Sequence, residues 1–131
     1  MSNSDLPPVG QRTQPVVGQT QTITLDEMPW QDTKWPDIKI KVLFQDEESG
    51  FSTIMFKFAP GAKTPKHEHM GVEQVIILEG GLQDHDGFYP AGTYISRIAG
   101  SVHQAFAPNG SLHVAFFTAK NRMLEDNYKF P

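Results

Sequence analysis

Alternating apolar and polar residues predict a chain built from short β-strands. From Ile38 to Phe44 every second residue is apolar, which is the period of a half-buried strand. After a polar turn, Phe51–Ala59 is expected to pair with it as a hairpin. Further apolar runs bounded by glycine, proline or asparagine lie at 75–78, 94–98, 102–107 and 112–118. Short strands at this near-regular spacing predict an all-β sandwich or small barrel.

One glycine pair and one Asp-Gly step punctuate the second half of this pattern. We expect Gly80-Gly81 to end the strand that begins at Val75, because glycine weakens a strand interior. The sequence His85-Asp86-Gly87 carries the Asp-Gly signal of a tight hairpin turn. The barrel is therefore predicted to span residues 23–118.

The two ends of the chain differ from the barrel in composition. Residues 1–22 are rich in Pro, Gly, Gln, Ser and Thr and can bury little apolar surface. We expect a flexible arm there, or an arm exchanged between subunits in which residues 14–25 add an edge strand. Residues 119–131 are expected to form a C-terminal tail with room for one helical turn.

Composition narrows the function classes. The chain has 131 residues, which favours one domain, and 11 Lys and Arg against 15 Asp and Glu give a net charge of −4. This balance argues against a nucleic-acid surface, and no apolar run approaches the ~20 residues of a membrane span. We expect a cytoplasmic protein. The absence of cysteine excludes disulfides, thiolate metal sites and cysteine nucleophiles.

Histidines supply the candidate chemistry. His67 and His69 are two residues apart, so on a strand both side chains point to one face. Glu73 follows His69 by four residues, about 13 Å along a straight strand, so the chain must bend near Gly71 for both to reach one ion. His103 begins a later strand. Nitrogen and oxygen donors without sulfur suit Fe(II), Mn(II), Ni(II) or Zn(II).

These residues carry a resemblance to the cupin superfamily (RmlC-like). The spacing Gly61-x5-His67-x-His69-x3-Glu73-x6-Gly80 matches the first cupin motif, and Gly92, Gly100 and His103 match part of the second. Two positions depart from the second motif, since Ile98 replaces its usual proline and Ala107 its usual asparagine. The resemblance covers about half of the chain, roughly residues 51–117, and implies a double-stranded β-helix or jelly-roll barrel.

The resemblance also implies a metal site and an activity. Its ligands would be His67, His69, Glu73 and His103 around one divalent ion, with Fe(II) favoured. The sequences TPKHEHMGVEQ and DHDGFYPAGTY look like the subgroup of acetylacetone-cleaving dioxygenases and the cupin domain of zinc-binding anti-sigma factors. Some members of it bind metal by three histidines with the glutamate hydrogen-bonded nearby. The family further implies a homodimer or higher homo-oligomer.

The first functional hypothesis is therefore a small dioxygenase that cleaves a carbon–carbon bond of a β-diketone-like or hydroxyketone substrate. A bidentate oxygen substrate and dioxygen would use open positions of the ion, which lowers the pKa of the substrate as a Lewis acid. The alternatives are a metal-bound sensor or regulatory module, like the anti-sigma domain, and a purely structural metal. A metal-free epimerase of the same fold is disfavoured, because all four ligand positions are filled.

Four further residues are candidates for substrate binding. An inward-facing Arg97 could hold an anionic group, although a surface or salt-bridged arginine is the simpler interpretation. Gln104 could orient a ligand, and Phe116 belongs to an aromatic stripe that could pack the core or line a pocket. His113 is expected to be a core-edge histidine with a backbone partner, or a pocket residue. His85 is expected at the surface. The candidate substrate-binding set is thus Arg97, Gln104, His113 and Phe116.

Overall fold

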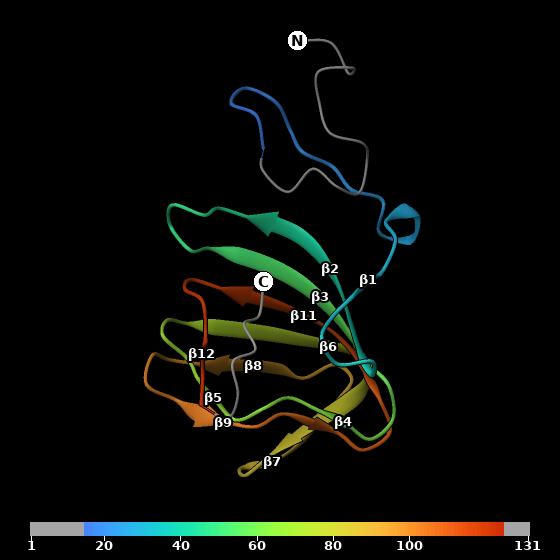
Figure 1. Ribbon diagram of the computed structural model, residues 1–131. Helices are drawn as coiled ribbons and strands as arrows, with labels where there is room; N and C mark the ends of the chain where they lie inside the picture. Colours follow the sequence, from blue (N-terminus) through green and yellow to red (C-terminus); the bar gives the residue numbers. More distant parts are fainter. Residues whose placement is uncertain (1–14, 125–131) are drawn as a thin grey trace.

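The structure, a computed structural model, describes residues 15–124, and strands dominate this part of the chain (Figure 1). The helical element assigned within it is one 3₁₀ turn, η2 (Leu25–Glu27). The predicted all-β class is confirmed. The strands are β1 (Gln31–Asp32), β2 (Ile38–Gln45), β3 (Ser52–Phe58), β4 (Ala62–Lys63), β5 (His67–Glu68), β6 (Glu73–Asp84), β7 (Gly87–Pro90), β8 (Tyr94–Arg97), β9 (Val102–His103), β10 (Phe106–Ala107), β11 (Ser111–Phe117) and β12 (Arg122–Met123).

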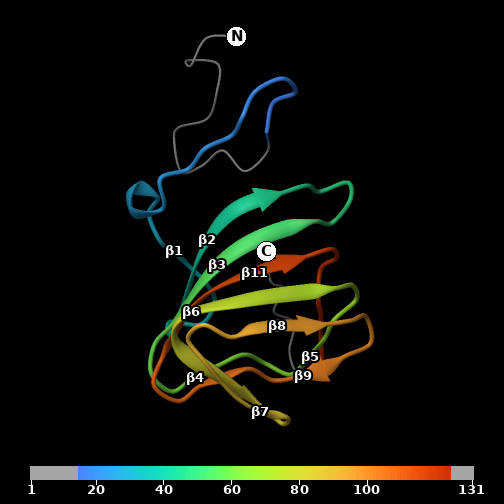
Figure 2. The same ribbon diagram turned by 180° about the vertical axis from the view of Figure 1, so that it is seen from behind.

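A curled antiparallel sheet forms most of the molecule. Its strand order is β1-β2-β3-β11-β6-β10-β4, and β7 and β8 also pair with β6. Figure 2 shows β2, β3, β11, β6 and β8 side by side. A second, three-stranded sheet has the order β12-β5-β9. Side chains from both sheets line one cavity, so the sheets face each other across the interior of a half-barrel.

The core is made by the inward residues of alternating strands. Ile38 and Ile40 of β2 and Ile54 of β3 are each 1% exposed, as period-two burial requires. The predicted hairpin of β2 and β3 is confirmed, with a register shift between Val42 and Phe44. Lys41 belongs to the outward face of β2 and yet is buried. Its Nζ donates to the Leu25 carbonyl and lies 4.5 Å from the centroid of the Trp30 ring, so the preceding segment covers this face.

Strand β6 crosses the glycine pair that was expected to end it. It runs on to Asp84, so that prediction is wrong. Gly80 has φ +68°, and a Cβ there would lie 2.1 Å from the Gly110 carbonyl oxygen. Glycine therefore permits a bend and a close backbone approach within a continuous strand. The first part of β6 pairs with β11 and β8 and the last part with β7 and β10, which brings Asp84 under the cavity.

Other boundaries also differ from the sequence pattern. The apolar run at 102–107 forms two short strands, β9 and β10, and the expected Asp-Gly hairpin joins β6 to β7 with Asp84 opposite Gly87. Residues 119–124 of the tail contain β12 and no helical turn. Residues 15–22 carry no strand in this chain, and subunit exchange of the arm stays a prediction. Residues 1–14 and 125–131 lie outside the described part.

Membrane insertion through a helix finds no support in the described residues, where no helix is long and apolar enough to cross a bilayer.

Candidate metal centre

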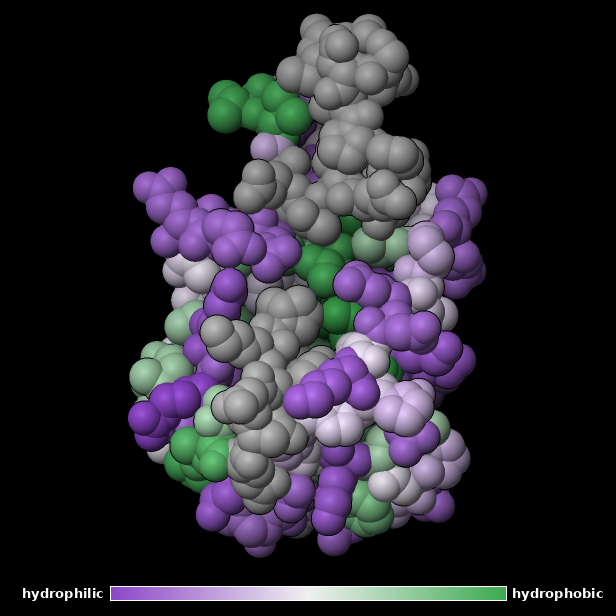
Figure 3. All heavy atoms as spheres, viewed as in Figure 1, coloured by the Kyte–Doolittle hydropathy of each residue, from purple (hydrophilic) through white to green (hydrophobic). Residues whose placement is uncertain are grey.

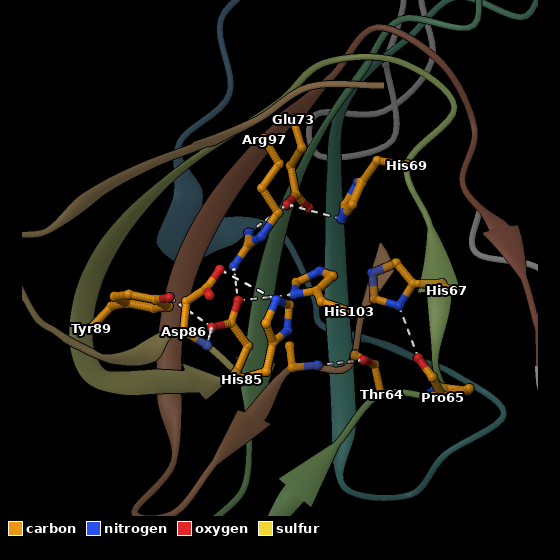
Figure 4. Close-up of polar contacts among 12 residues, drawn as sticks. Thr64, Pro65, His67, His69, Glu73, His85, Asp86, Tyr89, Arg97 and His103 are labelled. Carbon is orange, nitrogen blue, oxygen red and sulfur yellow. Dashed lines mark hydrogen bonds and ion pairs between the residues drawn. The ribbon is translucent and has the colours of Figure 1, made fainter. Parts of the chain in front are cut away.

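Three histidines from two neighbouring segments converge on one point. His67 and His103 are Cα partners in the ladder of β5 and β9, and His69 follows β5 directly. One ring nitrogen of each lies within 4.8 Å of the other two, and Figure 4 shows the rings turned toward one another. The side chains are at most 5% exposed. The two-residue spacing thus places His67 and His69 on one face, as predicted.

Hydrogen bonds orient two of the rings. His67 Nδ1 donates to the Pro65 carbonyl oxygen at 2.8 Å (Figure 4), and His103 Nδ1 lies 3.3 Å from Asp84 Oδ2. These partners leave Nε2 of each ring as the atom that would bind a metal, because the nitrogen that carries the proton is the one with the acceptor.

The buried histidine nitrogens are chemically suited to bind a metal ion. Among the described residues, Nδ1 and Nε2 of His69 and Nε2 of His103 are buried without a hydrogen-bond partner. A buried nitrogen without a partner costs free energy, so a partner that binds these atoms would stabilise the protein. A divalent ion that prefers imidazole would satisfy them. The described donor set therefore fits a metal held by three histidines.

Glu73 lies beside this cluster but binds Arg97. Its Oε1 accepts a hydrogen bond from Arg97 Nη1 at 2.8 Å and is 3.6 Å from His69 Nε2. Burial raises the pKa of Glu73, and the Arg97 guanidinium opposes this shift. The cluster of mutually close donor atoms contains the three histidines without Glu73. A fourth, carboxylate ligand stays a prediction.

Arg97 faces inward, but its guanidinium already forms ion pairs with two carboxylates. Its side chain is 11% exposed, and Nη2 donates to Asp84 Oδ2 at 2.9 Å while Nη1 binds Glu73. Asp84 also accepts a hydrogen bond from the Tyr89 hydroxyl at 2.6 Å. Burial disfavours ionisation of Asp84, but the hydrogen bonds from Tyr89 and Arg97 outweigh it and lower the Asp84 pKa. The interior arginine is thus both salt-bridged and inward-facing.

A small, mainly apolar cavity adjoins the histidines. The space open to the centres of water molecules is about 40 Å³, room for roughly three waters at about 10–15 Å³ each. On the face drawn in Figure 3, a strip of hydrophobic residues lies beside hydrophilic ones. Besides His67, Glu73, Arg97 and His103, the cavity is lined by Phe56, Phe58, Thr64, Val75, Leu82, Ala105, His113, Phe117 and Asn121.

The structure separates the other candidate residues. His113 is 4% exposed and lines the cavity, and its polar partner is the Ser111 hydroxyl rather than a backbone group. Phe116 is 40% exposed on the outer face of β11, away from the cavity. Gln104 lines a different groove, beside Lys63 and Lys66. His85 is at the surface, as predicted, with its side chain 64% exposed.

Sequence reasoning missed two residues of the site. Asp84 is not among the residues that the sequence predicts for the site, because its approach to His103 depends on the bend of β6 at Gly80. Asn121 lies in the tail, where β12 pairs with β5 opposite His67. A carboxylate at the end of a strand, preceding a turn, was the one local signal for Asp84.

The metal-free protein is expected to lose stability as pH falls from about 6.5. Burial lowers the pKa of His69 and His113 to about 3 and that of His103 to about 2. The unfolded chain therefore binds more protons below pH 6.5, and each contributes about 1.4 kcal/mol of lost stability per pH unit. Urea unfolding between pH 7.5 and 4.5 measures this slope. A flat profile would contradict it.

Comparison with known proteins supports the fold. No curated protein matches the chain. Among solved structures, an acetylacetone dioxygenase from Acinetobacter johnsonii matches with TM-score 0.72 and 18% identity, over 88% of this chain and 84% of that one. The Rhodobacter sphaeroides complex of SigE with the anti-sigma ChrR matches with TM-score 0.62 and 18% identity, over 72% of this chain and 51% of that one.

A protein of unknown function with a cupin-like fold from Ralstonia eutropha JMP134 matches with TM-score 0.63 and 24% identity. The match covers 72% of this chain and 63% of that one, so the chain spans less than two thirds of that relative. At such identities these likenesses show the fold alone. The sequence profile of the ChrR cupin-like domain, however, matches residues 18–122, most of the chain. The chain therefore belongs to the ChrR cupin-like domain family of cupins.

Proposed function

We propose that this protein is a small metal-dependent dioxygenase. It would cleave a carbon–carbon bond of a β-diketone-like or hydroxyketone substrate at an Fe(II) ion held by His67, His69 and His103. The observation that carries the proposal is that ring nitrogens of His69 and His103 are buried without a hydrogen-bond partner among the described residues, and that His67 and His103 line a small apolar cavity. When bound, the ion would supply Lewis acidity to an oxygen substrate and the redox chemistry for dioxygen.

The residues around the cavity suit such a substrate. Three neutral imidazoles leave the charge of a divalent ion intact, and the side chains of Glu73, Asp84 and Arg97 together add one negative charge when both carboxylates are ionised. The net charge near the ion is therefore positive, and it favours the binding of an enolate over that of a neutral ketone. Phe56, Phe58 and other apolar lining residues exclude water from the hydrocarbon part.

Oxygen uptake tests this proposal directly. Protein purified anaerobically and loaded with Fe(II) should consume one O₂ for each molecule of pentane-2,4-dione cleaved, since both oxygen atoms enter the two products. His67→Gln should lose this activity, and His85→Gln, which changes an exposed imidazole, should keep it. Full iron loading without oxygen uptake on a panel of small diketones and hydroxyketones would overturn the proposal.

A regulatory module is the second candidate. The family profile is that of the ChrR cupin-like domain, and one structural match is a SigE–ChrR complex. A sensor would hold Zn(II) and bind a small ligand in the same cavity without turnover. Native metal analysis that finds zinc, together with ligand binding and no oxygen uptake, would favour this function over the dioxygenase.

We further propose that the protein acts in the cytoplasm as a homodimer or higher homo-oligomer. The outward residues Ile76, Leu78, Tyr94 and Phe116 of β6, β8 and β11 are 40–57% exposed and uncharged, which supports an apolar contact between copies. Light scattering that finds only monomer at micromolar concentration would overturn the assembly.

A further inference from the structure

The inner wall of the large sheet holds one more buried imidazole, His113 of β11. It lies on the inner face of β11, four residues before Phe117, which pairs with Glu73 at the end of the strand. Four residues correspond to about 13 Å along a strand. His113 therefore lines the same cavity as the metal centre but belongs to another part of its wall.

Packing fixes the orientation of the His113 ring. The ring stacks on Phe56 with a centroid distance of 5.2 Å and an interplanar angle of 15°, and it meets Phe58 edge-on at 5.1 Å. Nδ1 lies 2.9 Å from the Ser111 hydroxyl oxygen. Two aromatic contacts and one hydrogen bond hold the ring in place, and a flip would break the bond to Ser111.

No hydrogen bond to Nε2 of His113 is found among residues 15–124. In the described part of the chain the only hydrogen bond of this ring is the one to Ser111. His113 lines the cavity, and its Nδ1 is taken by Ser111, so Nε2 is the ring nitrogen available to a ligand there. Because burial keeps the ring neutral, it offers either one N–H or one lone pair there, and no charge.

We propose that His113 is an anchoring residue for the far end of the ligand. This inference rests on the proposed function, in which the near end binds a metal ion at His67, His69 and His103. The ligand is then a small molecule with metal-binding oxygens at one end, a short apolar middle and a neutral hydroxyl or carbonyl group that hydrogen-bonds to His113 Nε2. A carboxylate at the far end is disfavoured, because Arg97 is occupied by two carboxylates.

Two isosteric probes test the anchor without turnover. Glycolohydroxamate and propionohydroxamate share one chelating group and differ only in a terminal hydroxyl against a methyl group. Zinc-loaded protein should bind the hydroxyl probe more tightly, as measured by calorimetry. In His113→Phe, which keeps the aromatic stacking, this preference should fall about three- to tenfold, the effect of one hydrogen bond. His113→Gln, which retains a polar group, should keep part of it.

The outcomes separate the two proposals. If both probes bind and the preference is the same in wild type and His113→Phe, the anchor is overturned and the metal site stands. If zinc binds but neither probe does, both proposals fall. Should His113→Phe fail to fold, nitrogen NMR of the zinc-loaded wild type decides, since only the hydroxyl probe should shift the His113 Nε2 resonance. An equal shift with both probes, or none, would overturn the anchor.

Discussion

Replacement of His69 by glutamine is expected to abolish stoichiometric metal binding. His69 is 1% exposed, and both of its ring nitrogens lack a hydrogen-bond partner in the described part of the chain. Loss of residues that merely orient a ligand typically costs 10–100-fold in affinity, so loss of a direct ligand should cost on the order of 100-fold or more. Metal analysis after dialysis should find less than about a tenth of the wild-type content at that change in affinity.

Two further variants give this prediction its controls. Glu73→Gln should retain most of the metal, because the Glu73 carboxylate is engaged by Arg97. A loss as large as that of His69→Gln would instead make Glu73 the fourth ligand. His85→Gln should bind like the wild type, since its side chain is exposed. Stoichiometric metal in a folded His69→Gln protein would remove the three-histidine centre.

Substitution of Arg97 by methionine is expected to destabilise the protein strongly. The side chains of Glu73 and Asp84 are 9% and 3% exposed, and both bind this guanidinium. Removal of one partner of a buried ion pair costs about 3–5 kcal/mol, because it leaves uncompensated buried charge. For a domain of this size the melting temperature should fall by roughly 10–20 °C, as thermal unfolding monitored by circular dichroism would show.

The loss should depend on the carboxylates that remain. A triple variant with Arg97→Met, Glu73→Gln and Asp84→Asn removes the unpaired charges and should recover much of the stability. Lys120→Met is the matched surface control, because its ion pair with Glu47 at 3.4 Å joins side chains that are 58% and 66% exposed. It should change stability by less than about 1 kcal/mol. An Arg97→Met protein as stable as Lys120→Met would contradict the buried network.

Local pattern predicted the strands well where burial alternates and poorly where the backbone bends. Strands β2, β3, β8 and β11 lie where the apolar runs placed them, because period-two burial is a local property. The glycine pair in β6 was read as an end, although it is a bend. Glycine permits both outcomes, and the contact of Gly80 with the Gly110 backbone, thirty positions away, decides between them.

The candidate site divides in the same way. The alternation of His67 and His69 placed two imidazoles on one face, and the spacing of His103 added the third. The sequence leaves the partner of Glu73 open, since a carboxylate can bind a metal ion or an arginine. The arginine that binds it is 24 residues away, and the register that pairs Glu73 with Arg97 is set by the whole sheet.

By itself, the sequence determined an all-β chain without sulfur ligands, with His67 and His69 on one face of a strand. These features follow from side-chain chemistry and two-residue alternation, which act over a few positions, whereas His103 joined the expected site through the resemblance to cupins. Tertiary structure alone decided that Arg97 is shared by Glu73 and Asp84, that the tail contributes Asn121, and that His113 opens to the cavity. Each of these contacts joins separate strands, so it depends on register and bending that no local pattern encodes.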